Sequence, residues 1–177
     1  WDHNTPMNVD WILGACFLIR REVLERCVGY FDEDYKLYFE DVDISLRARL
    51  AGWEVIYEPT ATVEHQVSAT ASKLGTFTLR HSVKNFLLLY AKNMPLRLYI
   101  KYSPLFALQY LRWLVTSTLR GKLFAFLAGT WAAIKLHPST VVKRRQIQQH
   151  ARLSAKDLDR LLYKHRPPRQ PAMPKKG

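Results

Sequence analysis

Three acidic residues follow an aromatic and apolar run in the segment KLYFEDVDISLRARLAGW, residues 36–53. They are Glu40, Asp41 and Asp43, and the run before them is residues 37–39. Buried carboxylates are costly unless they are paired, protonated or bound to a cation. One interpretation is structural, because acids in the first turn of a helix bind free amides and complement the dipole. The other is chemical: a carboxylate fixed beside apolar packing can act as a general base.

The charge of the chain is divided between its two halves. The 177 residues carry a net charge of +12, and 48% of them are hydrophobic, which is typical of a globular protein with a real core. Residues 1–72 hold thirteen of the fifteen acids and have a net charge of −7, whereas residues 73–177 have a net charge of +19. This division predicts two different roles. Because the chain starts at Trp1 and has no signal-peptide pattern, we expect an N-terminal portion to be missing.

The two cysteines, Cys16 and Cys27, indicate neither a disulfide framework nor a zinc site. They lie in apolar surroundings without CxxC spacing. We therefore expect two buried small hydrophobic side chains in a reducing, cytoplasmic compartment.

The elements that would position the acids can be predicted from the first half of the chain. VDWILGACFLIRR, residues 9–21, reads as a buried strand, and a short helix should follow it and end at Gly29. Val42, Leu46 and Leu50 recur every four residues before Gly52, which predicts a helix that starts at the acids. The alternation in WEVIYEP, residues 53–59, predicts a strand, and ATVEH, residues 61–65, a short extended piece. Residues 67–73 are expected to form a mobile loop.

The second half is predicted to be helical and amphipathic. Residues 76–93 place Phe77, Val83, Phe86, Leu87 and Tyr90 in one apolar stripe. Residues 96–136 are rich in large apolar side chains but contain basic residues throughout, and their longest uncharged run, residues 123–134, is shorter than the ~20 residues of a membrane span. We expect helices that lie in a membrane interface or against one another. The last twelve residues should be disordered.

The order of these parts resembles that in a known enzyme family. WILGACFLIRR, then VGYFDEDYKLYFEDVDISLRARLAGWEVIYEP, then ATVEH is similar to the C-terminal half of bacterial family 2 glycosyltransferases of the rhamnosyltransferase-like type. The resemblance implies an α/β fold: the C-terminal half of a GT-A fold, followed by an α-helical amphipathic region. It also implies that the missing half binds a nucleotide diphosphate sugar and supplies an acidic metal site.

The resemblance assigns roles to the acids and to one histidine. Asp41 matches the family's general base on the acceptor hydroxyl, and Glu40 matches its partner, which holds the acceptor or the base. His65 matches a histidine that ligates the divalent metal, Mg²⁺ or Mn²⁺, in some members. Without the resemblance, a lone histidine after a strand is more often a surface or hydrogen-bonded residue. Inverting sugar transfer needs a carboxylate near the acceptor hydroxyl, opposite a diphosphate leaving group whose charge a metal neutralises.

The resemblance also implies sites for ligands and a division of the chain. Gly14 and Ala15 match a small-residue turn against which the sugar lies, with Trp11 nearby. Residues 1–75 would be part of the catalytic domain, 76–165 a membrane-associating helical region and 166–177 a disordered basic tail. The implied enzyme is peripheral on the cytoplasmic face of the membrane and acts on a cell-surface glycan or a lipid-linked acceptor. We expect this piece alone to be inactive.

Two other interpretations stay open for the basic half. One is a truncated, non-catalytic module that docks on a membrane or a partner. The other, a nucleic-acid-binding module, is disfavoured because the bases alternate with large apolar residues and no nucleic-acid motif is present. The QYLRW segment, residues 109–113, fits a QxxRW pattern of processive synthases, but it lies far downstream of Asp41, and we interpret it as one helix face.

Overall fold

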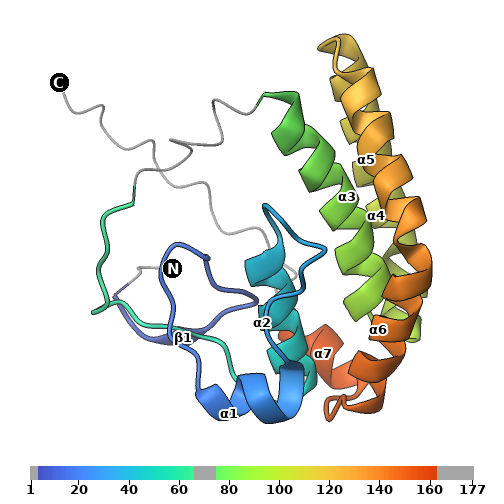
Figure 1. Cartoon of the computed structure of the whole chain (residues 1–177). Coiled ribbons are helices and arrows are strands. Elements are labelled where there is room, and N and C mark those ends of the chain that lie inside the picture. The colour runs from blue at the N-terminus through green and yellow to red at the C-terminus, as the bar shows by residue number, and fades with distance from the viewer. Residues whose placement is uncertain (1–3, 66–74, 163–177) are drawn as a thin grey trace, which may run out of the picture.

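The computed structural model describes residues 4–65 and 75–162, so the predicted loop at 67–73 and the predicted disordered tail lie outside the described residues. The described part is mostly helical, with one small sheet (Figure 1). In chain order the elements are β1 (Met7–Asn8), α1 (Arg21–Val23), the π-helix η1 (Leu24–Val28), α2 (Glu40–Leu50), β2 (Ile56–Tyr57), α3 (Thr76–Asn93), α4 (Leu96–Leu119), α5 (Leu123–Lys135), α6 (His137–Gln149) and α7 (Ala155–Leu161).

The predicted buried strand at residues 9–21 is wrong. The strands β1 and β2 pair antiparallel with Met7 opposite Tyr57, and residues 11–20 continue from β1 without strand structure. Leu18 in that stretch is 98% exposed. A buried strand needs a neighbouring strand and a covering layer, and within the described residues neither covers this run. The segment at 61–65 is likewise exposed and without a strand.

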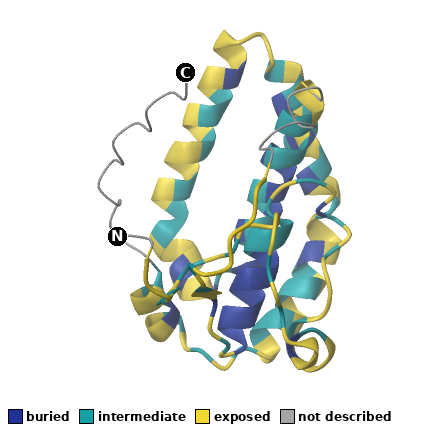
Figure 2. Ribbon diagram, turned by 90° about the vertical axis from the view of Figure 1, so that its left-hand side faces the viewer, coloured by how far each residue is buried: buried dark blue, intermediate teal, exposed yellow. Residues whose placement is uncertain are grey.

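The predicted alternation in residues 53–59 is confirmed, although the strand is only two residues long. Val55 is buried, Trp53 and Tyr57 are partly buried, and Glu54, Ile56 and Glu58 between them are exposed. The short helix after the apolar run is confirmed as α1 and η1, and it ends at Gly29 with a φ of 71°. Helix α2 is confirmed as well, and residues 43–51 are all buried (Figure 2).

The helices of the second half pack beside α2. Helix α3 contacts α5 most extensively and also contacts α6 and α2 (Figure 1). At the crossing of α3 and α5, a Cβ on Gly129 would lie 2.5 Å from the backbone oxygen of Arg80, so only glycine permits this approach. Leu88 of α3 packs with Ala133 of α5 and with Tyr35 from the loop before α2. The helical half thus reaches the loop that leads into the acidic cluster.

Several predicted side-chain environments need correction. Phe77 is 46% exposed rather than part of the buried stripe of α3. Phe126, in the stretch predicted to form helices that lie in a membrane interface or against one another, is fully buried. Cys16 is a free and exposed cysteine rather than a buried one. Among the described residues, no helix combines the length and the apolar character that crossing a membrane requires.

Candidate functional site

The acidic cluster follows a backbone corner of unusual conformation. Tyr38 and Phe39 have φ values of 67° and 69°, in the left-handed region that bulky residues seldom adopt. Asn85 of α3, which is fully buried, donates hydrogen bonds from Nδ2 to the backbone oxygens of Leu37, at 2.7 Å, and Tyr38, at 2.8 Å. Phe39 also packs against Phe86. Contacts with α3 hold this unfavourable backbone conformation in place. The conformation in turn sets the direction in which α2 begins.

Asp43 belongs to the structural core and not to the exposed site. Its side chain is fully buried, and Oδ2 accepts a hydrogen bond of 2.9 Å from Nε of Arg47. Oδ1 lies 2.7 Å from Nζ of Lys92 and 2.7 Å from Nδ2 of Asn93, both on α3. A buried carboxylate with three donors is compensated, so Asp43 joins α2 to α3. It does not bind a free amide at the start of α2, as the capping interpretation supposed.

A second set of ion pairs fixes the loop before the corner. Asp32 lies 2.5 Å from Nζ of Lys92 and 2.6 Å from Nζ of Lys143, which also lies 2.6 Å from Asp34. Burial alone would raise the pKa of Asp32, but the hydrogen bonds from Lys143 and Lys92 outweigh it and lower the pKa to about 2. Lysines of α3 and α6 therefore hold the loop from the helical half.

Asp41 is held in place by two backbone amides. Its Oδ2 accepts a hydrogen bond of 2.8 Å from the amide of Gly14, 27 residues earlier, and its Oδ1 accepts one of 2.8 Å from the amide of Val42. A neighbouring tether reinforces the contact, because Ser45 donates to the backbone oxygen of Asp41 and accepts from the amide of Ile12. Each carboxylate oxygen has a second lone pair, so Asp41 can still accept a proton from a substrate hydroxyl.

The structure thus brings together two residues that the sequence placed in separate parts of the site. Gly14 and Ala15 form a turn, as expected for the small-residue pair, and Gly14 contacts Asp41. Ala15 and Trp11 are exposed in the same stretch of chain. Their proposed contact with a sugar stays a prediction.

Glu40 is half-buried and lacks a full set of partners. Its Oε2 is buried without a hydrogen-bond partner among the described residues. Burial raises the pKa of the Glu40 carboxyl above its ordinary value, and the charge of Asp41 raises it further. The two neighbours therefore differ: Asp41 is stabilised by amides, whereas Glu40 is a carboxyl group that can hold a proton or bind a ligand.

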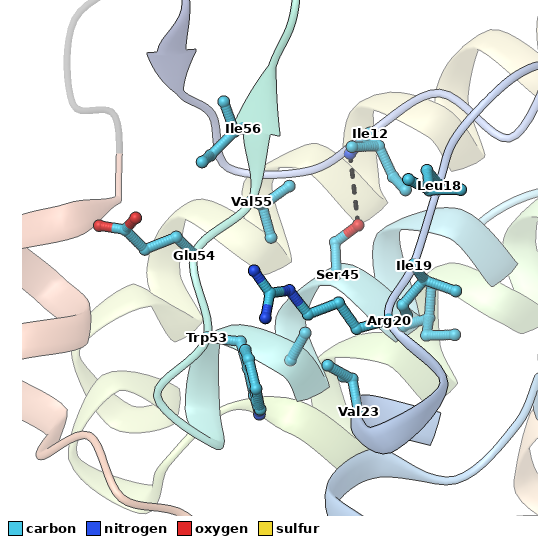
Figure 3. Close-up of a pocket in the computed structure, with 12 residues that line it drawn as sticks. Ile12, Leu18, Ile19, Arg20, Val23, Ser45, Trp53, Glu54, Val55 and Ile56 are labelled. Carbon is cyan, nitrogen blue, oxygen red and sulfur yellow. Dashed lines mark hydrogen bonds between the residues drawn. The ribbon is translucent and has the colours of Figure 1, made fainter. Parts of the chain in front are cut away.

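An apolar cavity of ≈ 270 Å³ is lined by both residues of the Ile12–Ser45 tether (Figure 3). Its walls come from the exposed run before α1, from α1, from α2 and from the segment leading into β2. Trp53 lines it, and its Nε1 has no hydrogen-bond partner among the described residues. Asp41 does not line this cavity, which is suited to packing and not to acid–base chemistry.

The described residues do not form a metal site by themselves. His65 is exposed at the edge of the described residues, and the structure shows no interaction of its side chain with another described residue. Within residues 4–65 and 75–162, no three His, Cys, Asp or Glu side chains gather as metal ligands would. His65 could hold a metal only together with ligands from elsewhere, so its role stays a prediction and no step of the chemistry is derived through a metal.

The sequence did not single out the residues that position the acids. Asn85 and Asn93 lie on α3, which the sequence predicted from its apolar stripe alone. Both asparagines are almost fully buried. A polar amide among core positions is the one signal that could have identified them, because buried amides need partners. Which partners they contact depends on the tertiary fold.

A carboxylate held by backbone amides at a helix start, beside a second carboxyl that lacks a full set of partners among the described residues, is the kind of site that group-transferring enzymes use. Residues 5–85, which contain every residue of this cluster, match the family described as glycosyltransferase like family 2. The matched part of the chain is therefore similar to family 2 glycosyltransferases, and the predicted resemblance is confirmed.

Two relatives are named as rhamnosyltransferases. The chain is 37% identical over 82 residues to the N-acetylglucosaminyl-diphospho-decaprenol L-rhamnosyltransferase of Mycobacterium tuberculosis (strain ATCC 25618 / H37Rv), a match that covers 46% of this chain and 26% of that protein. It is 40% identical over 57 residues to the rhamnosyltransferase WbbL of Escherichia coli (strain K12), which covers 32% of this chain and 21% of that protein. The matched region thus spans about a quarter of these relatives. No solved structure matches the chain.

Proposed function

We propose that the protein transfers a sugar, with inversion, from a nucleotide diphosphate donor to a glycan or lipid-linked acceptor. The family match and the two relatives named as rhamnosyltransferases support sugar transfer. The mycobacterial relative's name describes an acceptor that carries a sugar on a diphosphate-linked polyprenol. By analogy we propose L-rhamnose as the donor sugar and a phosphate-linked sugar as the acceptor.

The observation that carries the proposal is the geometry of Asp41. In an inverting transfer, a carboxylate takes the proton of the acceptor hydroxyl while that oxygen attacks the sugar carbon and the nucleotide diphosphate leaves. Two amides hold the Asp41 carboxylate in place, and the carboxylate lies at the start of α2, the end of a helix dipole that favours a negative charge. In this proposal Glu40, whose Oε2 is buried without a partner among the described residues, binds the same acceptor.

The GT-A fold is part of the proposal. The apolar run at residues 11–20 reads as strand in sequence, yet Leu18 is exposed and the run borders an apolar cavity. Such a surface is unfavourable unless another layer covers it. Further strands of a GT-A sheet, together with the donor site, would cover it and add the layer that the described residues lack.

Metal dependence also stays a proposal. We expect Mg²⁺ or Mn²⁺ to neutralise the donor diphosphate, and His65 is the one residue of this chain that we assign to the ion. Its other ligands would have to come from outside the described residues.

Attachment to the cytoplasmic face of an anionic membrane is the last part of the proposal. Helix α5 exposes an apolar stripe of Phe124, Leu127, Trp131 and Ile134, at intervals of three and four residues. Exposed Arg112, Arg120 and Lys122 could bind anionic headgroups. Other bases are engaged within the molecule: Lys101 contacts Asp159, Lys143 contacts Asp32, and Arg144 donates to the backbone oxygen of Ala91. The attaching surface is therefore smaller than the sequence predicted.

The test is an assay of the full-length enzyme. Nucleotide-diphospho-rhamnose and a panel of other nucleotide sugars are each offered with phosphate-linked and free sugar acceptors, with and without Mn²⁺. Transfer from one donor, with inversion seen in the product by NMR, is the expected result. Absence of transfer from every donor would leave the non-catalytic docking module as the better account.

A further inference from the structure

A second cavity lies between the first turns of α3 and the last turns of α4. Its volume is ≈ 290 Å³, and no acidic residue lines it. Hydroxyl groups of Thr78, Ser82, Thr116 and Ser117 line its length, and the aromatic side chains of Tyr38 and Trp113 belong to the same wall. Ser117 is 4% exposed and lines the cavity. A wall with hydroxyl groups and no acid suits a polar ligand that is neutral or anionic.

Two cations, Arg120 and Lys122, line the same cavity. Both are exposed, and neither side chain has an ion-pair partner among the described residues. Arg120 has an ordinary explanation, because it lies at the C-terminal end of α4, where a cation complements the dipole. The position of Lys122 has no such explanation. Lys122 is the N-cap of α5, and the positive end of a helix dipole disfavours a cation. An unfavourably placed, unpaired cation that lines a cavity indicates an anionic ligand.

The helix starts around the cavity add to the positive potential. Neither α3 nor α5 has an acidic residue in its first turn, and neither has a side-chain cap. Arg80 lies with Lys122 in an adjoining cavity of ≈ 440 Å³. A phosphate or diphosphate group suits such a region, because arginine and helix amides bind its oxygens with charge-assisted hydrogen bonds.

The cavity also reaches the backbone corner that precedes the acidic cluster. Tyr38 lines it and lies one residue before Phe39, the N-cap of α2. Asn85 fixes the backbone oxygen of Tyr38, so this wall is held rigidly relative to Glu40 and Asp41. One ligand could therefore place its anionic end at Lys122 and its other end at the acids.

We propose that this cavity binds the phosphate-linked end of the acceptor. Arg120 and Lys122 bind the phosphate or diphosphate. The hydroxyl groups of Ser82 and Ser117 donate hydrogen bonds to the sugar, whereas those of Thr78 and Thr116, which donate to backbone oxygens, accept them. The rings of Trp113 and Tyr38 cover the apolar face of that sugar and direct it towards Asp41. This assignment rests on the proposed sugar transfer and names the part of the acceptor that the enzyme recognises.

The test compares two double variants of the full-length enzyme that lose the same charge. The first is Arg120→Gln with Lys122→Gln, and the control is Arg97→Gln with Lys156→Gln, two exposed positions, on α4 and α7, that do not line the cavity. Each is titrated by calorimetry with a short-chain N-acetylglucosaminyl diphosphate and with the matching alkyl glycoside, without donor and without vesicles. A short chain in free solution excludes an effect of membrane charge.

We expect the first variant to bind the diphosphate-linked acceptor at least tenfold more weakly and the alkyl glycoside as wild type does. The control variant should bind both as wild type does. Equal affinity of the first variant and wild type for the diphosphate, equal weakening in both variants, or no binding of the diphosphate by wild type would each overturn the proposal. Because binding is measured without turnover, this outcome is separate from failure of the proposed sugar transfer, which the donor assay reports.

Discussion

The substitution Asp41→Asn tests the general base, and the structure shows that it changes more than charge. Both carboxylate oxygens accept a backbone amide, Oδ2 from Gly14 and Oδ1 from Val42, each at 2.8 Å. An asparagine has one oxygen, so its amino group must face one of these amides whichever way the side chain turns. Leaving one such donor unsatisfied costs about 1–2 kcal/mol. We therefore expect the variant to be less stable than wild type by about that amount.

The catalytic loss should be larger and of a different kind. Removing a general base typically lowers turnover by ~10² or more, which corresponds to about 2.7 kcal/mol in the barrier. Turnover of the full-length variant, donor binding and urea unfolding are measured together. We expect a large fall in kcat, almost unchanged donor affinity, and loss of the acid limb of the pH–rate profile, since that limb reports protonation of the base.

Ser45→Ala is the matched control for the structural part of the effect. Ser45 donates a hydrogen bond of 2.7 Å to the backbone oxygen of Asp41 and accepts one from Ile12, so its loss loosens the same junction while the carboxylate remains. It should cost about 1 kcal/mol of stability and leave the acid limb in place. The reasoning is refuted if Asp41→Asn keeps activity within a few-fold of wild type, or if Ser45→Ala lowers kcat equally.

The remaining predictions concern separate parts of the molecule. Because burial raises the pKa of Glu40, ionisation of its carboxyl opposes folding as pH rises. Glu40→Gln should therefore have a higher melting temperature than wild type at pH 7, and the difference should disappear below about pH 4. Scanning calorimetry at the two pH values measures it. The pKa of Asp32 is lowered to about 2, so its ionised form adds up to about 2 kcal/mol to the free energy of unfolding above pH 4, and this contribution is lost as pH falls through 2. In urea unfolding, Asp32→Asn should therefore be less stable than wild type at pH 7 but not at pH 2. His65→Ala should raise the Mn²⁺ requirement before it affects acceptor binding, and an unchanged metal titration would leave His65 a surface residue. Wild type should float with anionic vesicles at low salt and partly dissociate at high salt, whereas Phe124→Ser with Trp131→Ser should remain in solution; a wild type that does not float contradicts membrane attachment.

Hydrophobic periodicity predicted the helices because the information is local. Val42, Leu46 and Leu50 lie on one face of α2, and Gly52, with a φ of 88°, follows the end of that helix. The stripe of α3 was recovered in the same way, apart from the exposed Phe77 at its first turn. A helix forms its backbone hydrogen bonds within itself, so a single segment is enough to identify it.

The apolar run at residues 11–20 shows where local reasoning failed. Its composition predicts a buried strand, yet burial is decided by the neighbours that cover it and not by the run itself. Among the described residues, the run lacks a pairing strand, and Leu18 is almost fully exposed. Composition thus identified a segment that favours burial, but it could not supply the layer that buries it.

The candidate site was predictable in its residues and not in its contacts. Asp41 and Gly14 were each identified from the resemblance, but the hydrogen bond between them depends on how residues 11–20 return to α2. The three acids also looked equivalent in sequence. Only their environments separate them, with Asp43 in a buried ion network, Asp41 bound by amides and Glu40 without a partner for one oxygen. The role of each acid depends on which residues lie near it in the fold, and a single sequence does not give those distances.

Helix α3 is what makes the acidic cluster a rigid site. The left-handed conformations of Tyr38 and Phe39 are unfavourable by about 1–2 kcal/mol each. Two hydrogen bonds from Asn85, together with the packing of Phe39 against Phe86, offset that cost. One and two turns further along α3, Leu88 packs on the preceding loop and Lys92 binds Asp43. The same helix forms a wall of the cavity that holds Arg120 and Lys122. An acceptor bound in that cavity, as proposed above, would therefore be held by the same helix that fixes the corner before Asp41.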